Sequence, residues 1–99
     1  MRIQVSREEA ELLYTATRLW GEAFQENMVI EECSELITAI RHFNRGKLSH
    51  EELVTEVVDV LIVCTQLAIN LDPIYAEDEM ERRLERLRER VETNNHASA

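Results

Sequence analysis

The stretch LVTEVVDVLIVCTQLAIN, from Leu53 to Asn70, decides the fold of this chain. Wound into a helix, it places apolar side chains around most of the circumference and gathers the polar ones in a stripe about 100° wide. A helix that is apolar on its other sides is buried among neighbouring elements. The stretch therefore predicts a central buried helix with two carboxylates on one face. The stripe consists of Thr55, Glu56, Asp59, Gln66 and Asn70, and Thr65 is the one polar residue outside it.

Capping and turn signals divide the remaining sequence into three further helices. Capping boxes open two helices, a glycine suits a helix end, and a proline suits a first helical turn. These signals are Ser6 with Glu9, Ser49 with Glu52, Gly46, and Asp72 before Pro73. The predicted helices cover about residues 7–20, 24–42, 51–70 and 73–93. Residues 94–99, NNHASA, are small and polar and are expected to form a disordered tail.

The short connections between these helices make sequence neighbours antiparallel. With 99 residues, only two Gly, one Pro and 44% hydrophobic residues, the chain has the composition of one helical domain. We therefore expect an all-α fold with a four-helix bundle-like core, formed by residues 1–93. A chain of this length buries only about two-thirds of its unfolded surface, so additional packing between copies would stabilise it.

The charge balance and the N-terminus limit the partners and the compartment. The formal net charge of −9 argues against nucleic acid bound through a basic surface, so no such partner is expected. No apolar run is long enough to span a bilayer, and residues 1–10 lack the apolar core of a secretory signal. We expect a cytoplasmic protein without membrane contact, with Cys33 and Cys64 reduced.

A second acidic pair precedes the central helix, in the segment VIEECSELITAI at residues 29–40. Glu32 lies at the edge of the apolar face of this helix, Glu35 one turn along, and Glu31 further toward solvent. If this pair faces the two carboxylates of the central helix, four acidic groups need a cation. Such oxygen-rich sites suit Mg²⁺, with Mn²⁺ as a substitute. A solvated acidic face and a structural network with arginine are the alternatives.

The two acidic motifs together resemble a known pattern. EECSEL at residues 31–36, followed by EVVD at residues 56–59, resembles the EExxE…ExxD signature of the MazG-like all-α nucleoside triphosphate pyrophosphohydrolases. The segments WGEAFQENMVIEE at 20–32 and HFNRGK at 42–47 are similar to single-domain members of that family. The resemblance covers about residues 20–90, which is most of the chain.

This resemblance implies a reaction, a metal and an assembly. The expected reaction is Mg²⁺-dependent hydrolysis of a (deoxy)nucleoside triphosphate to a monophosphate and pyrophosphate, in the service of nucleotide-pool house-cleaning. The family has a four-helix core and is usually assembled as dimers or dimers of dimers, so a homodimer or homotetramer is expected. By position, Glu32, Glu35, Glu56 and Asp59 match the magnesium ligands. Glu31 and Glu35 are the expected catalytic residues, with Glu31 orienting or deprotonating the attacking water.

Further residues are candidates for contacts with the nucleotide. Asn70 and Gln66 continue the acidic stripe and could reach it. Trp20 could stack on the base together with Phe24 and Met28, with core packing as the alternative. Three arginines on one flank of the last helix could hold the phosphate tail, and ion pairing along a solvated helix explains them equally well. They are Arg83, Arg86 and Arg90, beside an apolar seam of Met80, Leu84, Leu87 and Val91 that is expected to be buried.

Two other functions are compatible with the sequence. Phosphoribosyl-ATP pyrophosphatase of histidine biosynthesis shares the paired acidic motif, and product analysis separates it from the leading hypothesis. A non-enzymatic acidic helical assembly module would use the apolar third helix as a contact surface and would bind no magnesium. Independently of function, Val58, Ile62 and Ile69 are expected to meet a second subunit.

Overall fold

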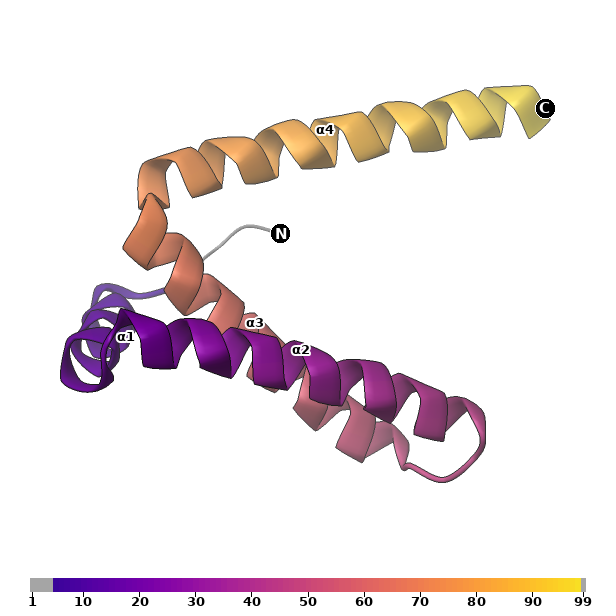
Figure 1. Ribbon diagram of the computed structural model, residues 1–99. Coiled ribbons are helices and arrows are strands. Elements are labelled where there is room, and N and C mark those ends of the chain that lie inside the picture. The colour runs from indigo at the N-terminus through magenta and orange to yellow at the C-terminus, as the bar shows by residue number, and fades with distance from the viewer. Residues whose placement is uncertain (1–4, 99) are drawn as a thin grey trace.

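The computed structural model describes residues 5–98, with side chains for residues 5–95. This part of the chain consists of helices and contains no strand, which confirms the predicted all-α fold (Figure 1). Four helices follow one another with short connections between them. They are α1 (Arg7–Trp20), α2 (Glu22–Asn44), α3 (His50–Leu71) and α4 (Pro73–Ser98).

Both predicted capping boxes are present and start their helices where the sequence indicates. At α1, the Ser6 N–H donates to Glu9 Oε1 at 2.8 Å, and the Glu9 N–H donates to Ser6 Oγ at 3.1 Å. The same exchange joins Ser49 and Glu52 at the start of α3, at 3.2 and 3.1 Å. Each box provides acceptors for N–H groups that have no partner inside the helix, which fixes the first turn.

Helices α2 and α3 form an antiparallel hairpin, and they make the most extensive helix contact in the described chain (Figure 1). Gly46 in the connecting turn has φ of 72°, a left-handed conformation that favours glycine. Ala39 of α2 is buried in this hairpin helix, whereas the outer sides of α2 and α3 stay exposed. The hairpin therefore has one covered seam and two open sides.

Helix α1 crosses the C-terminal half of α3 and is held there by polar contacts. Gly21, with φ of 94°, separates α1 from α2 and lets the chain turn sharply between them. The Tyr14 hydroxyl donates to the Ile69 carbonyl at 3.1 Å, and the Gln66 amide of α3 donates to the Leu13 carbonyl at 3.3 Å. Ile69 is buried, so the expectation that it meets a second subunit is wrong. Its side of α3 faces α1.

Helix α4 leaves the other three helices as an arm (Figure 1). The Asp72 carboxylate caps it, accepting from the Tyr75 N–H at 3.0 Å, and among the described helices α4 contacts α3 alone. Of the seam predicted on this helix, Met80 and Leu84 are half-buried, whereas Leu87 and Val91 are 52% and 49% exposed, so its C-terminal half is not buried within the chain. The helix also continues to Ser98, past its predicted end near residue 93, because the sequence there contains no Gly or Pro to stop it.

Within the described residues, no helix combines the length and the apolar character that crossing a membrane requires.

Candidate metal centre

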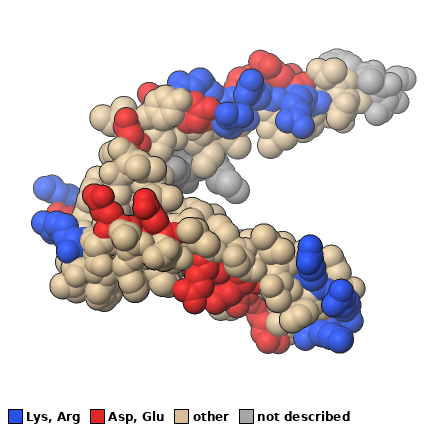
Figure 2. All heavy atoms as spheres, viewed as in Figure 1, with Lys and Arg blue, Asp and Glu red and all other residues tan. Residues whose placement is uncertain are grey.

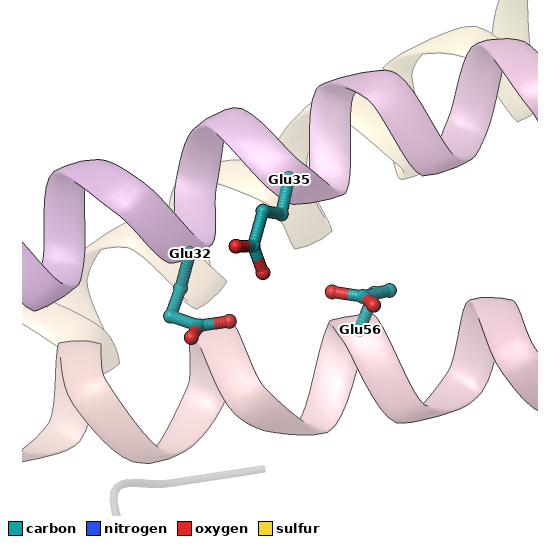
Figure 3. Close-up of side chains that lie close together, drawn as sticks. All are labelled: Glu32, Glu35 and Glu56. Atoms are coloured by element: carbon teal, nitrogen blue, oxygen red, sulfur yellow. The ribbon is translucent and has the colours of Figure 1, made fainter.

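Three carboxylates meet midway along the hairpin (Figure 3). Glu32 and Glu35 project from α2 one turn apart, and Glu56 projects toward them from α3. One carboxylate oxygen from each residue lies within 4.8 Å of the other two. Glu56 of the polar stripe of α3 faces α2, so residues 21 or more positions apart share one small volume.

Two of these carboxylates have an oxygen without any partner. Glu32 Oε2 and Glu56 Oε2 are buried from solvent, and neither accepts a hydrogen bond from the described residues. An ionised oxygen in this state loses its hydration without compensation, which costs about 1–3 kcal/mol or more. The two oxygens come from different helices and from two residues of the same trio, so one bound cation could satisfy both.

The electrostatics of the cluster lack a positive charge. Burial raises the pKa of Glu32 above its usual range, and the neighbouring carboxylates of Glu35, Asp59, Glu56 and Glu31 raise it further, in that order. Among the described residues, none of the ion pairs includes a carboxylate of this cluster. The carboxylates therefore repel one another in the absence of a ligand, which a divalent cation would reverse.

The remaining two predicted acidic residues lie around this trio. Asp59 is half-buried and is not part of the trio, yet it is near enough to Glu32 to raise the pKa of that carboxyl. Glu31 is exposed and has the smallest effect on Glu32 of the four acids. The structure thus brings together Glu32, Glu35 and Glu56, with Asp59 and Glu31 at the border.

The donor set indicates the kind of ion that would fit. Three carboxylates, two of them half-buried and one exposed, offer hard oxygen ligands, which Mg²⁺ and Mn²⁺ prefer over softer nitrogen or sulfur sites. Because Mg²⁺ takes six oxygen ligands, coordination by this trio leaves positions for water and for the oxygens of a phosphate. The site residues therefore fit the ion that the sequence predicts.

A cleft of ≈ 360 Å³ opens beside Glu35 and Glu56. Thr38 and His42, which sequence reasoning did not single out, line it together with the two carboxylates. Both follow Glu35 on the same side of α2, at i+3 and i+7, and this spacing is the signal that could have identified them. The residues that line the cleft are Ser34, Glu35, Thr38, Ala39, His42, Leu48 and Glu56.

The amides predicted to reach substrate are engaged inside the fold. Gln66 Nε2 donates to Thr17 Oγ1 at 2.7 Å, and Asn70 Nδ2 donates to the same oxygen at 2.6 Å. The Thr17 hydroxyl in turn donates to the Leu13 carbonyl at 3.2 Å, which uses its full hydrogen-bonding capacity. Gln66 and Asn70 thus join α1 to α3 through their amide nitrogens, and substrate contact by either residue stays a prediction.

The other predicted substrate residues lie away from the lining of the cleft. Arg83 pairs with Glu79 at 2.8 Å, while Arg86 and Arg90 are exposed on the α4 arm. Because α4 contacts α3 alone, one chain does not place these arginines beside the carboxylates of α2. Trp20 is exposed, with its ring 6.0 Å from that of Phe24, so it is not packed in a core.

Comparison of the chain with models of known protein families, with curated proteins and with solved structures gave no match. The likeness to MazG-like enzymes therefore rests on the sequence motifs alone, of which the two acidic ones carry the metal-ligand positions. Of the four positions that match the family's metal ligands, the fold brings Glu32, Glu35 and Glu56 together across two helices.

Proposed function

We propose that this protein is a Mg²⁺-dependent nucleoside triphosphate pyrophosphohydrolase. The observation that supports it is the carboxylate trio on facing helices, with unpartnered buried oxygens on Glu32 and Glu56. A divalent cation would stabilise a cluster in this state. Proteins commonly bind the phosphates of a nucleotide through a cation that carboxylates hold. The resemblance of the same residues to the EExxE…ExxD signature supplies the reaction class.

The proposed reaction joins water to one phosphorus of the α–β bridge and breaks the bridging bond, releasing a nucleoside monophosphate and pyrophosphate. When bound, Mg²⁺ would neutralise charge on the phosphate oxygens and lower the pKa of a bound water. Glu32, Glu35, Glu56 and Asp59 would hold it. Glu31, exposed and one turn from Glu35 on α2, would accept the proton of the attacking water.

The cleft beside the trio could hold the rest of the nucleotide. It begins at Glu35 and Glu56 and extends to His42 and Leu48 near the hairpin turn. The hydroxyls of Ser34 and Thr38 offer hydrogen bonds along it. A substrate anchored by its phosphates at the metal would therefore find polar and apolar contacts within reach. Removal of surplus or non-standard nucleotides in the cytoplasm is the role that we propose for this activity.

Two measurements test the proposal directly. Calorimetric titration of the metal-free protein with Mg²⁺ should show binding that Glu56→Gln weakens strongly, because that change replaces a buried ligand with a neutral amide. Pyrophosphate release from a panel of ribo- and deoxyribonucleoside triphosphates should then require Mg²⁺. Phosphoribosyl-ATP belongs in the panel, and its selective hydrolysis would favour the histidine-pathway enzyme instead. Absence of Mg²⁺ binding would leave the helical assembly module as the better account.

A further inference from the structure

One segment of this acidic chain contains no acid. Residues 36–50, which form the end of α2 and the turn to α3, include no Asp or Glu, although the whole chain has 20 of them. The same segment has three basic residues, Arg41, Arg45 and Lys47, and these are the only Lys and Arg between residues 22 and 71. Figure 2 shows basic side chains at this turn. The positive charge of the hairpin is therefore concentrated at the end toward which the metal cleft extends.

Arg41 and Arg45 have no acidic partner among the described residues. Ion pairs along a helix form between positions three or four apart, and at these distances from Arg41 and Arg45 the sequence has no Asp or Glu in either direction. On α4, by contrast, Arg83 pairs with Glu79 at 2.8 Å. Pairing along a solvated helix therefore explains the α4 arginine but not the two arginines of the hairpin.

These two arginines continue a row of hydroxyl groups that lines the metal cleft. Four residues of this stretch follow one another at spacings of four, three and four, which places them on one flank of α2. They form the donor row: Ser34, Thr38, Arg41 and Arg45. Its first two members line the cleft beside Glu35 and Glu56. Each member carries a hydrogen-bond donor, and within the described part of the chain none of these donors has a partner.

The geometry of the helix directs the arginines toward the carboxylates. Each Cα–Cβ bond of an α-helix tilts toward the N-terminus, and long side chains follow that direction. Arg41 lies six residues after Glu35, about 9 Å along the helix axis. An arginine side chain that extends toward the N-terminus can span much of this gap. The cleft between them contains Glu56, whose buried Oε2 has no hydrogen-bond partner among the described residues and independently indicates a ligand here.

We propose that the donor row binds the phosphate chain of a nucleoside triphosphate whose reacting phosphate lies at the carboxylate trio. Arginine suits this role because its planar guanidinium can bond two phosphate oxygens at once, and hydroxyl groups add single donors. A divalent cation at the trio supplies positive charge at one end of the chain, and the arginines supply it at the other. The leaving pyrophosphate then lies along the donor row.

This arrangement makes the donor row a measure of phosphate-chain length. A monophosphate held at the trio ends before Arg41 and Arg45, whereas the terminal phosphates of a triphosphate reach them. The row therefore selects triphosphates over their monophosphate products. The inference rests on the metal centre of the proposed function and adds the residues that recognise the rest of the substrate.

Calorimetric titration with tripolyphosphate at saturating Mg²⁺ tests the donor row. Arg41→Gln and Arg45→Gln should each weaken tripolyphosphate binding about tenfold, because each removes a charged donor. Binding of Mg²⁺ without phosphate should change less than about twofold, since neither residue is a metal ligand. Arg88→Gln is the matched control: the same change of charge on the exposed α4 arm should leave both affinities unchanged. Circular dichroism verifies that all variants are folded.

Two outcomes separate this inference from the proposed function. Normal Mg²⁺ binding with equal tripolyphosphate affinity in all three variants would overturn the donor row and leave the metal centre standing. Absence of Mg²⁺ binding in the unmodified protein would overturn the metal centre, and the donor row with it.

A nucleoside triphosphate with a methylene group in place of the α–β bridging oxygen provides the second ligand, because it resists hydrolysis at that bond. Both arginine variants should weaken its binding as much as they weaken that of tripolyphosphate, since the two ligands share the phosphate chain. Weakening of the nucleotide alone would place the row at the base or sugar and refute the inference. The unmodified protein should bind the nucleotide more tightly than tripolyphosphate, and the reverse order would overturn a nucleotide as the source of the chain.

Discussion

Glutamate side chains have opposite electrostatic surroundings in the α2–α3 hairpin and in the α4 arm. On α4, Glu79 accepts from Arg82 and Arg83, each at 2.8 Å, and the hydrogen bonds from these two arginines lower its pKa. In the hairpin, burial and neighbouring acids raise the pKa of Glu32, and no arginine or lysine pairs with it among the described residues. Glu79 on the arm is thus neutralised by arginines of its own helix, whereas Glu32 in the hairpin has no basic partner among the described residues.

The same contrast is visible on the surface (Figure 2). Along α4, basic and acidic side chains lie side by side, while acidic side chains gather on the hairpin and basic ones at its turn. A run of glutamates in the sequence therefore does not by itself indicate a ligand site. The position of the nearest cation in the fold distinguishes a solvated helix from a candidate ligand site.

The largest expected effect is the loss of turnover on neutralising one hairpin carboxylate. Glu35→Gln should reduce Mg²⁺-dependent pyrophosphate release by more than about 100-fold, because a direct ligand counts for at least as much as an outer-shell partner. Helical circular dichroism should be unchanged. Glu85→Gln on α4, where the carboxylate pairs with Arg88 at 3.3 Å, is the matched control and should keep full activity. Equal activity of both variants would remove the distinction between the two regions.

The next effect concerns how α1 is held against the hairpin. Thr17→Val keeps the shape of a buried side chain but removes the acceptor of the Gln66 and Asn70 amides. The half-buried Asn70 amide then loses this partner, and Gln66 Nε2 keeps only its hydrogen bond to the Leu13 carbonyl at 3.3 Å, so we expect a destabilisation of about 1–3 kcal/mol. Urea unfolding followed by circular dichroism measures it. Arg88→Ala, which breaks an exposed pair on α4, should cost less than about 1 kcal/mol and serves as comparison.

The raised pKa of Glu32 predicts a pH dependence for the metal-free protein. A carboxyl with a higher pKa in the folded than in the unfolded state binds more protons when folded, so this group adds stability as pH falls from neutral through its folded pKa. Below the unfolded pKa the gain is complete. The lowered pKa of Glu79 has the opposite sign, and its stabilisation is lost only at lower pH.

Urea midpoints at about pH 7 and pH 5.5 should therefore differ more in the unmodified protein than in Glu32→Gln. Saturating Mg²⁺ should remove the difference, because the ion binds the deprotonated carboxylate. A Glu32→Gln variant with the same pH dependence as the unmodified protein, measured without metal, would show that this group does not carry the effect.

The smallest expected effects concern the arginines of α4. Because Arg83 is paired with Glu79 on an exposed helix, Arg83→Ala should change stability by less than about 1 kcal/mol. If the ion-pairing interpretation is correct, the KM for a triphosphate should also stay near its normal value in Arg83→Ala, Arg86→Ala and Arg90→Ala. A rise in KM of about ten- to a hundredfold in one of them would instead support phosphate binding by that residue.

Local signals predicted the helices and the proximity of Glu32, Glu35 and Glu56. The serine capping boxes fixed the starts of α1 and α3, and the polar stripe of α3 correctly placed Glu56 toward α2. The direction of α4 was not predictable, because Asp72 and Pro73 determine where that helix starts and not which surface it contacts. The sequence also did not predict which side of α3 is covered by α1. Apolar residues surround most of that helix, so its pattern did not reveal that Ile69 is covered while Val57 and Cys64 are exposed.

The contacts of Thr17 have a consequence for the order in which the chain folds. Its two amide partners lie 49 and 53 residues away in the sequence, whereas α2 and α3 meet through a turn of a few residues. Short loops close faster than long ones, so we expect the hairpin to form first and α1 to dock onto it afterwards. During synthesis α1 leaves the ribosome before the helices that it contacts, so it has no surface to pack against until they have followed. The carboxylate trio can assemble without it, from the segment of 25 residues that begins with Glu32 and ends with Glu56.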